Sequence, residues 1–203
     1  MEAAAEASRL VDRVDRPDLL LVGALFHDIG KGYPGDHTEV GVDLLQTIAT
    51  RMGFDADDVE TLVAMVQHHL LLPDVATRRD LDDDGTIASV ADAVRSSRLL
   101  HLLGALTEAD SIATGPSAWS SWKGGLVNEL VSRVSHVLAG GDVGEVVGGS
   151  FPDAEQRLLL EDGSFLVRGE GRTLTVVAAD RTGTFSKVAG VLSLNGADVV
   201  GAS

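Results

Sequence analysis

Leu19–Gly32 of this 203-residue chain, with the sequence LLLVGALFHDIGKG, joins a long apolar run to two ionisable side chains. Eight consecutive apolar or glycine residues, from Leu19 to Phe26, run directly into His27 and Asp28. A segment that is apolar on every side predicts a helix buried all round rather than an amphipathic surface helix. The imidazole and the carboxylate at its end are costly to bury unless something pairs with them. A bound metal ion would satisfy both groups, and a salt-bridged His-Asp pair is the alternative.

Composition limits the classes of protein to consider. The formal net charge of −15 disfavours nucleic-acid binding, because such a chain repels phosphate backbones. The absence of cysteine excludes disulfides and thiolate metal sites and is compatible with a reducing compartment. No apolar run approaches the roughly 18 residues of a membrane span, and the acidic N-terminus does not resemble a signal peptide. We therefore expect a soluble cytoplasmic protein without a membrane partner.

Helix signals on either side of the buried segment place a second histidine near the first in sequence. Residues 2–14 have high helix propensity. After a short turn, Asp36 is a good N-cap for a helix that begins at His37, with Glu39 as the capping-box partner. His37 therefore lies in a first helical turn, close to the His27-Asp28 pair in sequence. The alternative is that His37 simply begins a surface helix.

A third helix carries two adjacent histidines. Asp55 is the predicted N-cap, and the helix is expected to run to Leu71 before Pro73 stops it. At about 100° per residue, His69 lies at the edge of the apolar stripe and His68 on the opposite side. His69 is thus the better placed of the two for an inward-facing site.

Residues 74–86 are predicted to be a polar loop that carries Arg78, Arg79 and several aspartates. The acidic run is most simply a solvated turn. The spacing of Asp80 and Asp82 invites a nucleotidyltransferase interpretation, but the Gly-Ser turn that this chemistry requires does not precede it.

A carboxylate on an apolar face marks the next long helix, predicted from Ser97 to about Ala113. Leu99, Leu103 and Leu106 share one face, and Asp110 falls on that same face. A charged residue at a position where helical periodicity predicts an apolar one is typical of functional sites. The alternative is a buried aspartate satisfied by backbone amides or by an arginine.

The second half of the chain changes character after one more helix. Gly115-Pro116 ends the preceding helix, and Ser117 is the predicted cap of the next, which carries Lys123 between apolar positions. Residues 139–150 contain five glycines and are interpreted as a linker. Asp162-Gly163 then predicts a hairpin turn between two short strands.

A β-α-β unit is predicted at the end of the sequence. Residues 173–179 form the expected first strand, residues 183–194 the helix, and residues 197–201 the second strand. Asn195-Gly196 is the expected end of the helix.

Several helices thus present imidazoles and carboxylates that could share one site. The candidate metal ligands are His27, Asp28, His37, His69 and Asp110. A site without thiols favours Mg²⁺, Mn²⁺, Fe or Zn²⁺ over Cu(I). Since such an ion lowers the pKa of bound water and neutralises phosphoryl oxygens, the expected chemistry is hydrolysis of a phosphate ester.

Ordered motifs in residues 16–135 resemble the HD-type phosphohydrolase domain, in the version found in bifunctional uridylyltransferase/uridylyl-removing enzymes. The motifs are HDIGKG at 27–32, GDH at 35–37, HHLLLP at 68–73, RRDL at 78–81, LTEADSIATGP at 106–116 and WSSWK at 119–123. The tail VVAADRTGTFSKVAGVLSLNGADV resembles the start of an ACT domain, although Thr182 stands where a proline is usual.

This resemblance implies a mainly α fold: an HD-domain helical bundle followed by a truncated α+β, β-α-β ACT-like segment. We expect the HD domain at residues 1–138, a Gly-rich linker at 139–154, and a β-hairpin with a partial ACT domain at 155–203. The order also implies an internal fragment of a longer enzyme whose transferase domain is not in this chain.

The resemblance further implies a metal-dependent phosphodiesterase, with Mg²⁺ or Mn²⁺ as cofactor, that removes a uridylyl group from the nitrogen regulatory protein PII. Glutamine would act on the complete ACT domains. Asp28 and Lys31 would be catalytic, and substrate would be bound by Lys31, Arg78, Arg79 and Lys123.

Two alternatives stay open. One is a free-standing HD hydrolase of small nucleotides such as guanosine tetraphosphate. The other is a metal-free HD scaffold that relays the ligand state of the ACT domain. The scaffold is favoured by the lack of any histidine before His27, where the family has one upstream of the buried helix.

Overall fold

The computed structural model describes residues 1–144, 165–171, 173–179, 181 and 183–197. The chain divides into two compact units, Met1–Val147 and Gly148–Ser203, and each is described by itself. The mainly helical class predicted from the sequence is confirmed, with a small two-stranded region in the second unit. None of the described helices is long and apolar enough to cross a membrane.

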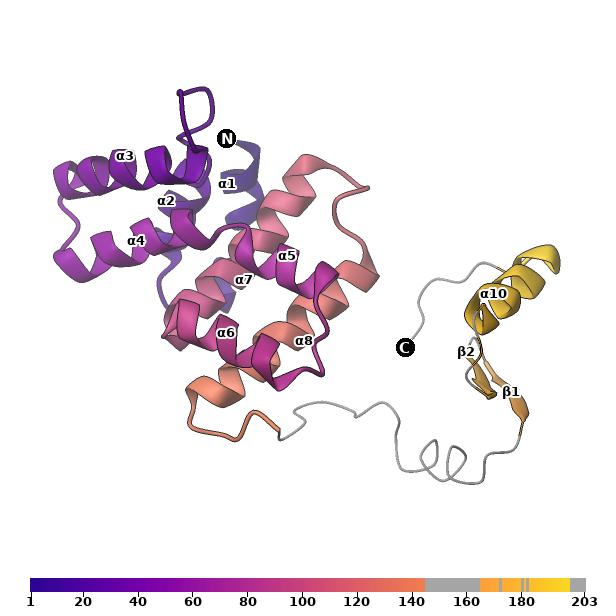
Figure 1. Cartoon of the computed structure of the whole chain (residues 1–203). Helices are drawn as coiled ribbons and strands as arrows, with labels where there is room; N and C mark the ends of the chain where they lie inside the picture. Colours follow the sequence, from indigo (N-terminus) through magenta and orange to yellow (C-terminus); the bar gives the residue numbers. More distant parts are fainter. Residues whose placement is uncertain (145–164, 172, 180, 182, 198–203) are drawn as a thin grey trace. The chain divides into compact units, whose positions relative to one another are not determined.

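The described part of the first unit, residues 1–144, is built from helices without strands (Figure 1). In chain order its elements are α1 (Glu2–Ala7), the 3₁₀ turn η1 (Val11–Arg13), α2 (Pro17–Phe26), α3 (His37–Met52), α4 (Ala56–His68), α5 (Leu71–Arg78), α6 (Asp84–Val94), α7 (Ser97–Thr114) and α8 (Ser121–Leu138). Residues 2–14, which have high helix propensity, thus form two short helical pieces, α1 and η1.

The apolar segment forms α2, which packs against α1, α4 and α7. Leu19 and Leu20 are fully buried, and Ala24 is nearly so. Leu25, however, is 43% exposed, so the helix is not buried all round as predicted. A uniformly apolar sequence does not encode which side lacks a neighbouring helix, and α2 has one such side.

Local side-chain caps fix the beginnings of the next two helices, as predicted. The Asp36 carboxylate accepts hydrogen bonds from the backbone N–H groups of Thr38 and Glu39 and so begins α3. The Asp55 carboxylate accepts from the N–H of Asp58 and begins α4. Both aspartates satisfy amides that have no intrahelical partner.

The predicted end of α4 is wrong. The helix ends at His68, and a new helix, α5, begins at Leu71. Pro73 lies in the first turn of α5, where its missing N–H costs no intrahelical hydrogen bond. The polar loop predicted for residues 74–86 is for this reason largely helical, and only residues 79–83 separate α5 from α6.

The beginning of α7 and its end at Gly115 agree with the prediction, but α8 begins later than expected. Its cap is Ser120, whose hydroxyl accepts from the backbone N–H of Lys123, and not Ser117.

The second unit contains β1 (Leu166–Glu170), β2 (Thr173–Val177) and α10 (Thr184–Leu194). The strands pair antiparallel with Leu166 opposite Val177. The helix ends as predicted at Asn195-Gly196, where Gly196 has φ 76°. The predicted hairpin turn at Asp162-Gly163, the strand after residue 197 and most of the linker lie outside the described residues.

Candidate metal centre

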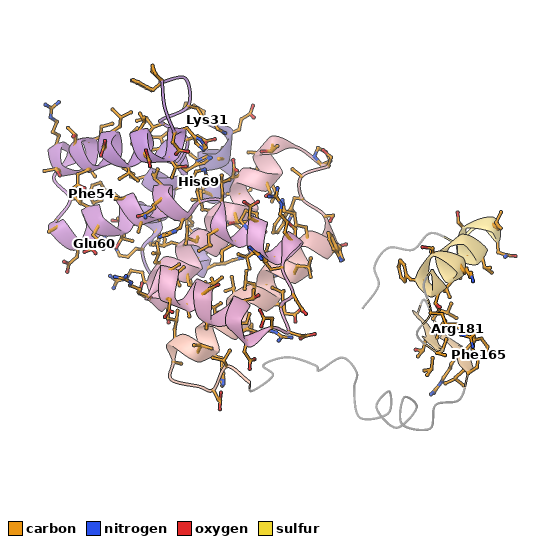
Figure 2. The ribbon with its side chains drawn as sticks, viewed as in Figure 1. Lys31, Phe54, Glu60, His69, Phe165 and Arg181 are labelled. Atoms are coloured by element: carbon orange, nitrogen blue, oxygen red, sulfur yellow. The ribbon has the colours of Figure 1, made fainter. Side chains whose placement is uncertain are left out.

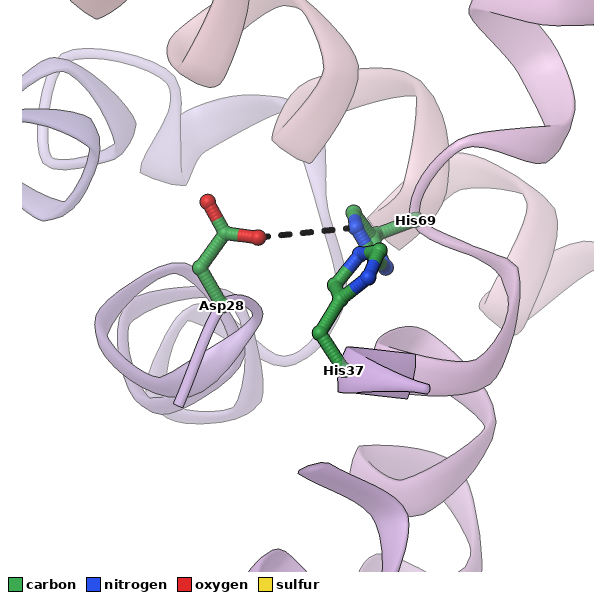
Figure 3. Close-up of side chains that lie close together, drawn as sticks. All are labelled: Asp28, His37 and His69. Atoms are coloured by element: carbon green, nitrogen blue, oxygen red, sulfur yellow. Dashed lines mark ion pairs between the residues drawn. The ribbon is translucent and has the colours of Figure 1, made fainter. Parts of the chain in front are cut away.

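The ends of α2 and α4, the beginning of α3 and the C-terminal half of α7 meet at one point in the helical unit. This meeting brings together five of the side chains that the sequence singled out: His27, Asp28, His37, His69 and Asp110. Figure 3 shows three of them, with the ion pair between Asp28 and His69 dashed.

Two of the histidines occupy the same local position, because His27 is the C-cap of α2 and His69 is the C-cap of α4. His27 Nδ1 lies 2.9 Å from the carbonyl oxygen of Ala24, and His69 Nδ1 lies 2.6 Å from that of Val66. A carbonyl oxygen can only accept, so each Nδ1 carries the proton. In a neutral ring, Nε2 then presents its lone pair to the centre.

Helical periodicity does not predict these carbonyl partners, although the sequence contains a signal for them. Carbonyls in the last turn of a helix lack an intrahelical donor, and each histidine follows its partner by three residues. Backbone hydrogen bonds of this kind fix the tautomer and the ring orientation of metal-binding histidines.

The inward-facing atoms of His27 and Asp28 lack hydrogen-bond partners. His27 is 7% exposed, and its Nε2 lies 3.2 Å from an oxygen of Asp28 and 3.2 Å from an oxygen of Asp110. Neither approach has hydrogen-bond geometry, and Nε2 is a buried unsatisfied atom. Asp28 Oδ1, 3.7 Å from His69 Nε2, is unsatisfied too. Buried polar atoms left unpaired in this way are costly, and a shared cation would satisfy them.

Asp28 is common to two possible ligand sets. One set is His27, Asp28 and Asp110, and the other is Asp28, His37 and His69; in each, the ligand atoms lie within 4.8 Å of one another. The His37 and His69 rings are 5.7 Å apart and nearly perpendicular. A donor set of imidazole nitrogens and carboxylate oxygens without sulfur fits Mn²⁺, Mg²⁺, Fe²⁺ or Zn²⁺.

The charged and buried groups of the centre shift one another's pKa values. Burial lowers the pKa of His27, but Asp110, the Ala24 carbonyl and Asp28 outweigh it, and the net pKa is raised. The pKa of Asp110 is lowered, chiefly by its interaction with His27. Burial lowers the pKa of His69 and so favours its neutral form.

Lys31 lies at the rim of the centre (Figure 2). Its ammonium is 2.6 Å from Asp28 Oδ2, while 64% of its side chain is exposed. The lysine therefore contacts a candidate metal ligand and solvent at the same time.

Three other predicted site residues are not brought into this cluster by any described hydrogen bond or ion pair. Arg78 pairs with Asp74 at 3.7 Å and is largely exposed. Lys123 donates to the carbonyl oxygen of Ala118 at 3.0 Å. Arg79 is exposed and is the C-cap that follows α5.

Comparisons with known proteins agree with the geometry. Residues 1–96 match the model of the HD domain. A bifunctional uridylyltransferase/uridylyl-removing enzyme of Streptomyces coelicolor is 54% identical over 159 residues, which cover 78% of this chain and 19% of the relative. The enzyme of the same name from Mycobacterium tuberculosis is 46% identical over the whole chain and 26% of its own length. That of Gluconobacter oxydans is 34% identical over 90% of the chain and 24% of the relative. The chain thus spans about a quarter or less of the length of these relatives.

Proposed function

This chain belongs to the family of the bifunctional uridylyltransferase/uridylyl-removing enzymes, and we propose that its helical unit is a metal-dependent phosphodiesterase that removes a uridylyl group from the PII protein. The observation that carries the proposal is the pair of buried, unsatisfied atoms His27 Nε2 and Asp28 Oδ1 between helix ends. A structural salt bridge would have satisfied them with hydrogen bonds, whereas metal ligands require free lone pairs.

The ligand roles follow from the two sets. His27, Asp28 and Asp110 would hold a divalent ion, Mg²⁺ or Mn²⁺, and His37 and His69 would complete its coordination or hold a second ion with Asp28. Such an ion polarises phosphoryl oxygens and lowers the pKa of water. The chain's own part is to keep both Nε2 lone pairs directed inward, through the carbonyls that hold each Nδ1.

Basic side chains bind the substrate in this proposal. Lys31 exchanges its contact with Asp28 for a phosphoryl oxygen, which its exposure at the rim allows. Arg78, Arg79 and Lys123 contact more distant parts of a protein substrate. In the cytoplasm, glutamine would act through complete ACT domains of the whole enzyme, of which the second unit resembles a part.

Paired substitutions on α7 test the proposal. Asp110→Asn removes a carboxylate ligand, whereas Glu108→Gln, two residues away, alters an ion pair with Arg13 that is not part of the candidate ligand sets. We expect Asp110→Asn to lower the release of UMP from uridylylated PII, measured with Mn²⁺, by at least about a hundredfold. Glu108→Gln should stay within about twofold of the parent chain.

Equal loss in both variants would contradict the assignment of Asp110. Binding of Mn²⁺ by the parent chain without release of UMP would remove the proposed reaction but leave the metal centre. Absence of both would favour a metal-free scaffold.

A further inference from the structure

Gly30 lies where the turn after α2 crosses the beginning of α3. It is buried, and so is Gly41 in α3. A Cβ atom added to Gly30 would overlap the carbonyl oxygen of His37 and lie 2.7 Å from the amide nitrogen of Gly41. Those two atoms are four residues apart, the separation of a hydrogen-bonded pair in a first helical turn.

The requirement for glycine at this position is spatial. The φ of Gly30 is outside the left-handed region, unlike that of its neighbours Gly32 and Gly35, so the backbone alone would accept alanine. The obstacle is main chain, which cannot rotate away as the end of a side chain can. Any side chain at Gly30 must therefore change the spacing between this turn and the first turn of α3.

The first turn of α3 carries a candidate ligand. His37 is the first residue of α3, whereas His27 and Asp110 come from α2 and α7. A shift of α3 moves His37 away from Asp28 and His69 but leaves the set of His27, Asp28 and Asp110 in place.

We propose that Gly30 is a positioning residue that sets His37 beside Asp28 and His69 through the close crossing of its backbone with α3. This inference rests on the proposed metal centre, which it deepens. Gly41 contributes to the same crossing: a Cβ there would lie 3.6 Å from Gly30 nitrogen and 3.0 Å from Val66 Cγ1.

A double-mutant cycle on Mn²⁺ affinity tests it. Gly30→Ala should weaken binding of Mn²⁺ alone, measured by calorimetry on the purified chain, by about tenfold or more, and to the same extent as His37→Ala. The double variant Gly30→Ala/His37→Ala should bind no more weakly than His37→Ala, because both changes remove the same ligand. The free energy of unfolding, measured in EDTA, reports any loss of stability separately.

Gly23→Ala is the matched control on α2. A Cβ at Gly23 would meet the terminal atoms of the Met65 side chain, which can move, and no backbone. We expect it to lower stability and to leave Mn²⁺ affinity within about twofold. Should Gly30→Ala fail to fold, Gly41→Ala takes its place in the cycle with His37→Ala. We then expect a smaller loss of Mn²⁺ affinity, which again does not add to the loss caused by His37→Ala.

Parent-like affinity in the Gly30→Ala variant, or additive losses in the double variant, would overturn the inference. A parent chain that binds no Mn²⁺ would overturn it too, since no centre would exist to be positioned. Coupling in the cycle together with absent UMP release would leave the inference intact and refute only the proposed reaction.

Discussion

At the scale of single residues, protons and metal ions compete for the same ligand atoms of the centre. His27 lies between two carboxylates that favour a positive charge, and its pKa is raised in the metal-free chain although burial opposes this. A divalent ion requires the neutral ring instead. The metal-free and metal-bound proteins should therefore respond to pH in opposite directions.

We expect the free energy of unfolding in EDTA to fall as pH rises above 6.5. The proton on His27 stabilises the folded state fully below its ordinary pKa of 6.5, and this contribution is lost as pH rises through the raised folded pKa. The lowered pKa of His69 changes the free energy of unfolding only below pH 6.5, outside the range in which His27 has its effect. Urea unfolding between about pH 6 and pH 9 should show a slope of at most about 1.4 kcal/mol per pH unit.

Asp110→Asn should make that slope shallower, because it removes the carboxylate that contributes most to raising the pKa of His27. Saturating Mn²⁺ should reverse the sign of this slope, so that the free energy of unfolding rises with pH, because fewer protons then compete with the ion for the His27 ring. A slope that is the same in all three samples would contradict this account.

At the scale of helices, the first residue of each helix can be predicted where its N-cap depends only on a few neighbouring residues. Asp36 and Asp55 were predictable because the acceptor and its amides lie within three residues. The beginning of α8 was not, because Ser117 and Ser120 are both acceptable caps and the choice depends on how the chain leaves α7.

Ser120→Ala should lower the free energy of unfolding by about 1 kcal/mol, because its hydroxyl accepts the N–H of Lys123 at the beginning of α8. Ser117→Ala is the matched control and should change it by less than about 0.5 kcal/mol, since Ser117 lies outside the helix. Chemical denaturation of both variants measures the difference, and equal effects would argue against Ser120 as the cap.

The candidate site shows the same division between local and distant information. The spacing of His69 and of Asp110 along their helices indicated inward-facing positions, and the structure brings both to the centre. The exposure of Leu25 and the separation of Arg78 from the centre depend on which helices are neighbours. Periodicity within one element does not contain that information.

At the scale of the whole molecule, the two units differ in how much apolar surface they bury. The helical unit has a continuous core, whereas Val177 is the one buried hydrophobic residue among those described in the second unit. The division between Val147 and Gly148 falls within the predicted 139–154 linker, whose bounds stay a prediction.

Hydrogen exchange should reflect this difference. Amides of Leu19–Phe26 in α2 are expected to exchange far more slowly than those of Thr173–Val177 in β2, because opening a two-stranded sheet exposes little apolar area. The buried positions of α7 serve as a second reference for slow exchange. Equal protection in α2 and β2 would mean that the second unit is stabilised by a contact outside the described residues.

The placement of His27 and His69 at helix C-termini has an electrostatic consequence. Peptide dipoles add along a helix and leave about half a negative charge at its C-terminal end. Since α2 and α4 both end at the centre and α3 begins there, two negative ends and one positive end meet at it, which leaves a net negative charge of about half a unit. The backbone itself thus attracts a cation there, and a chain with one ligand replaced by a neutral side chain should retain part of that attraction.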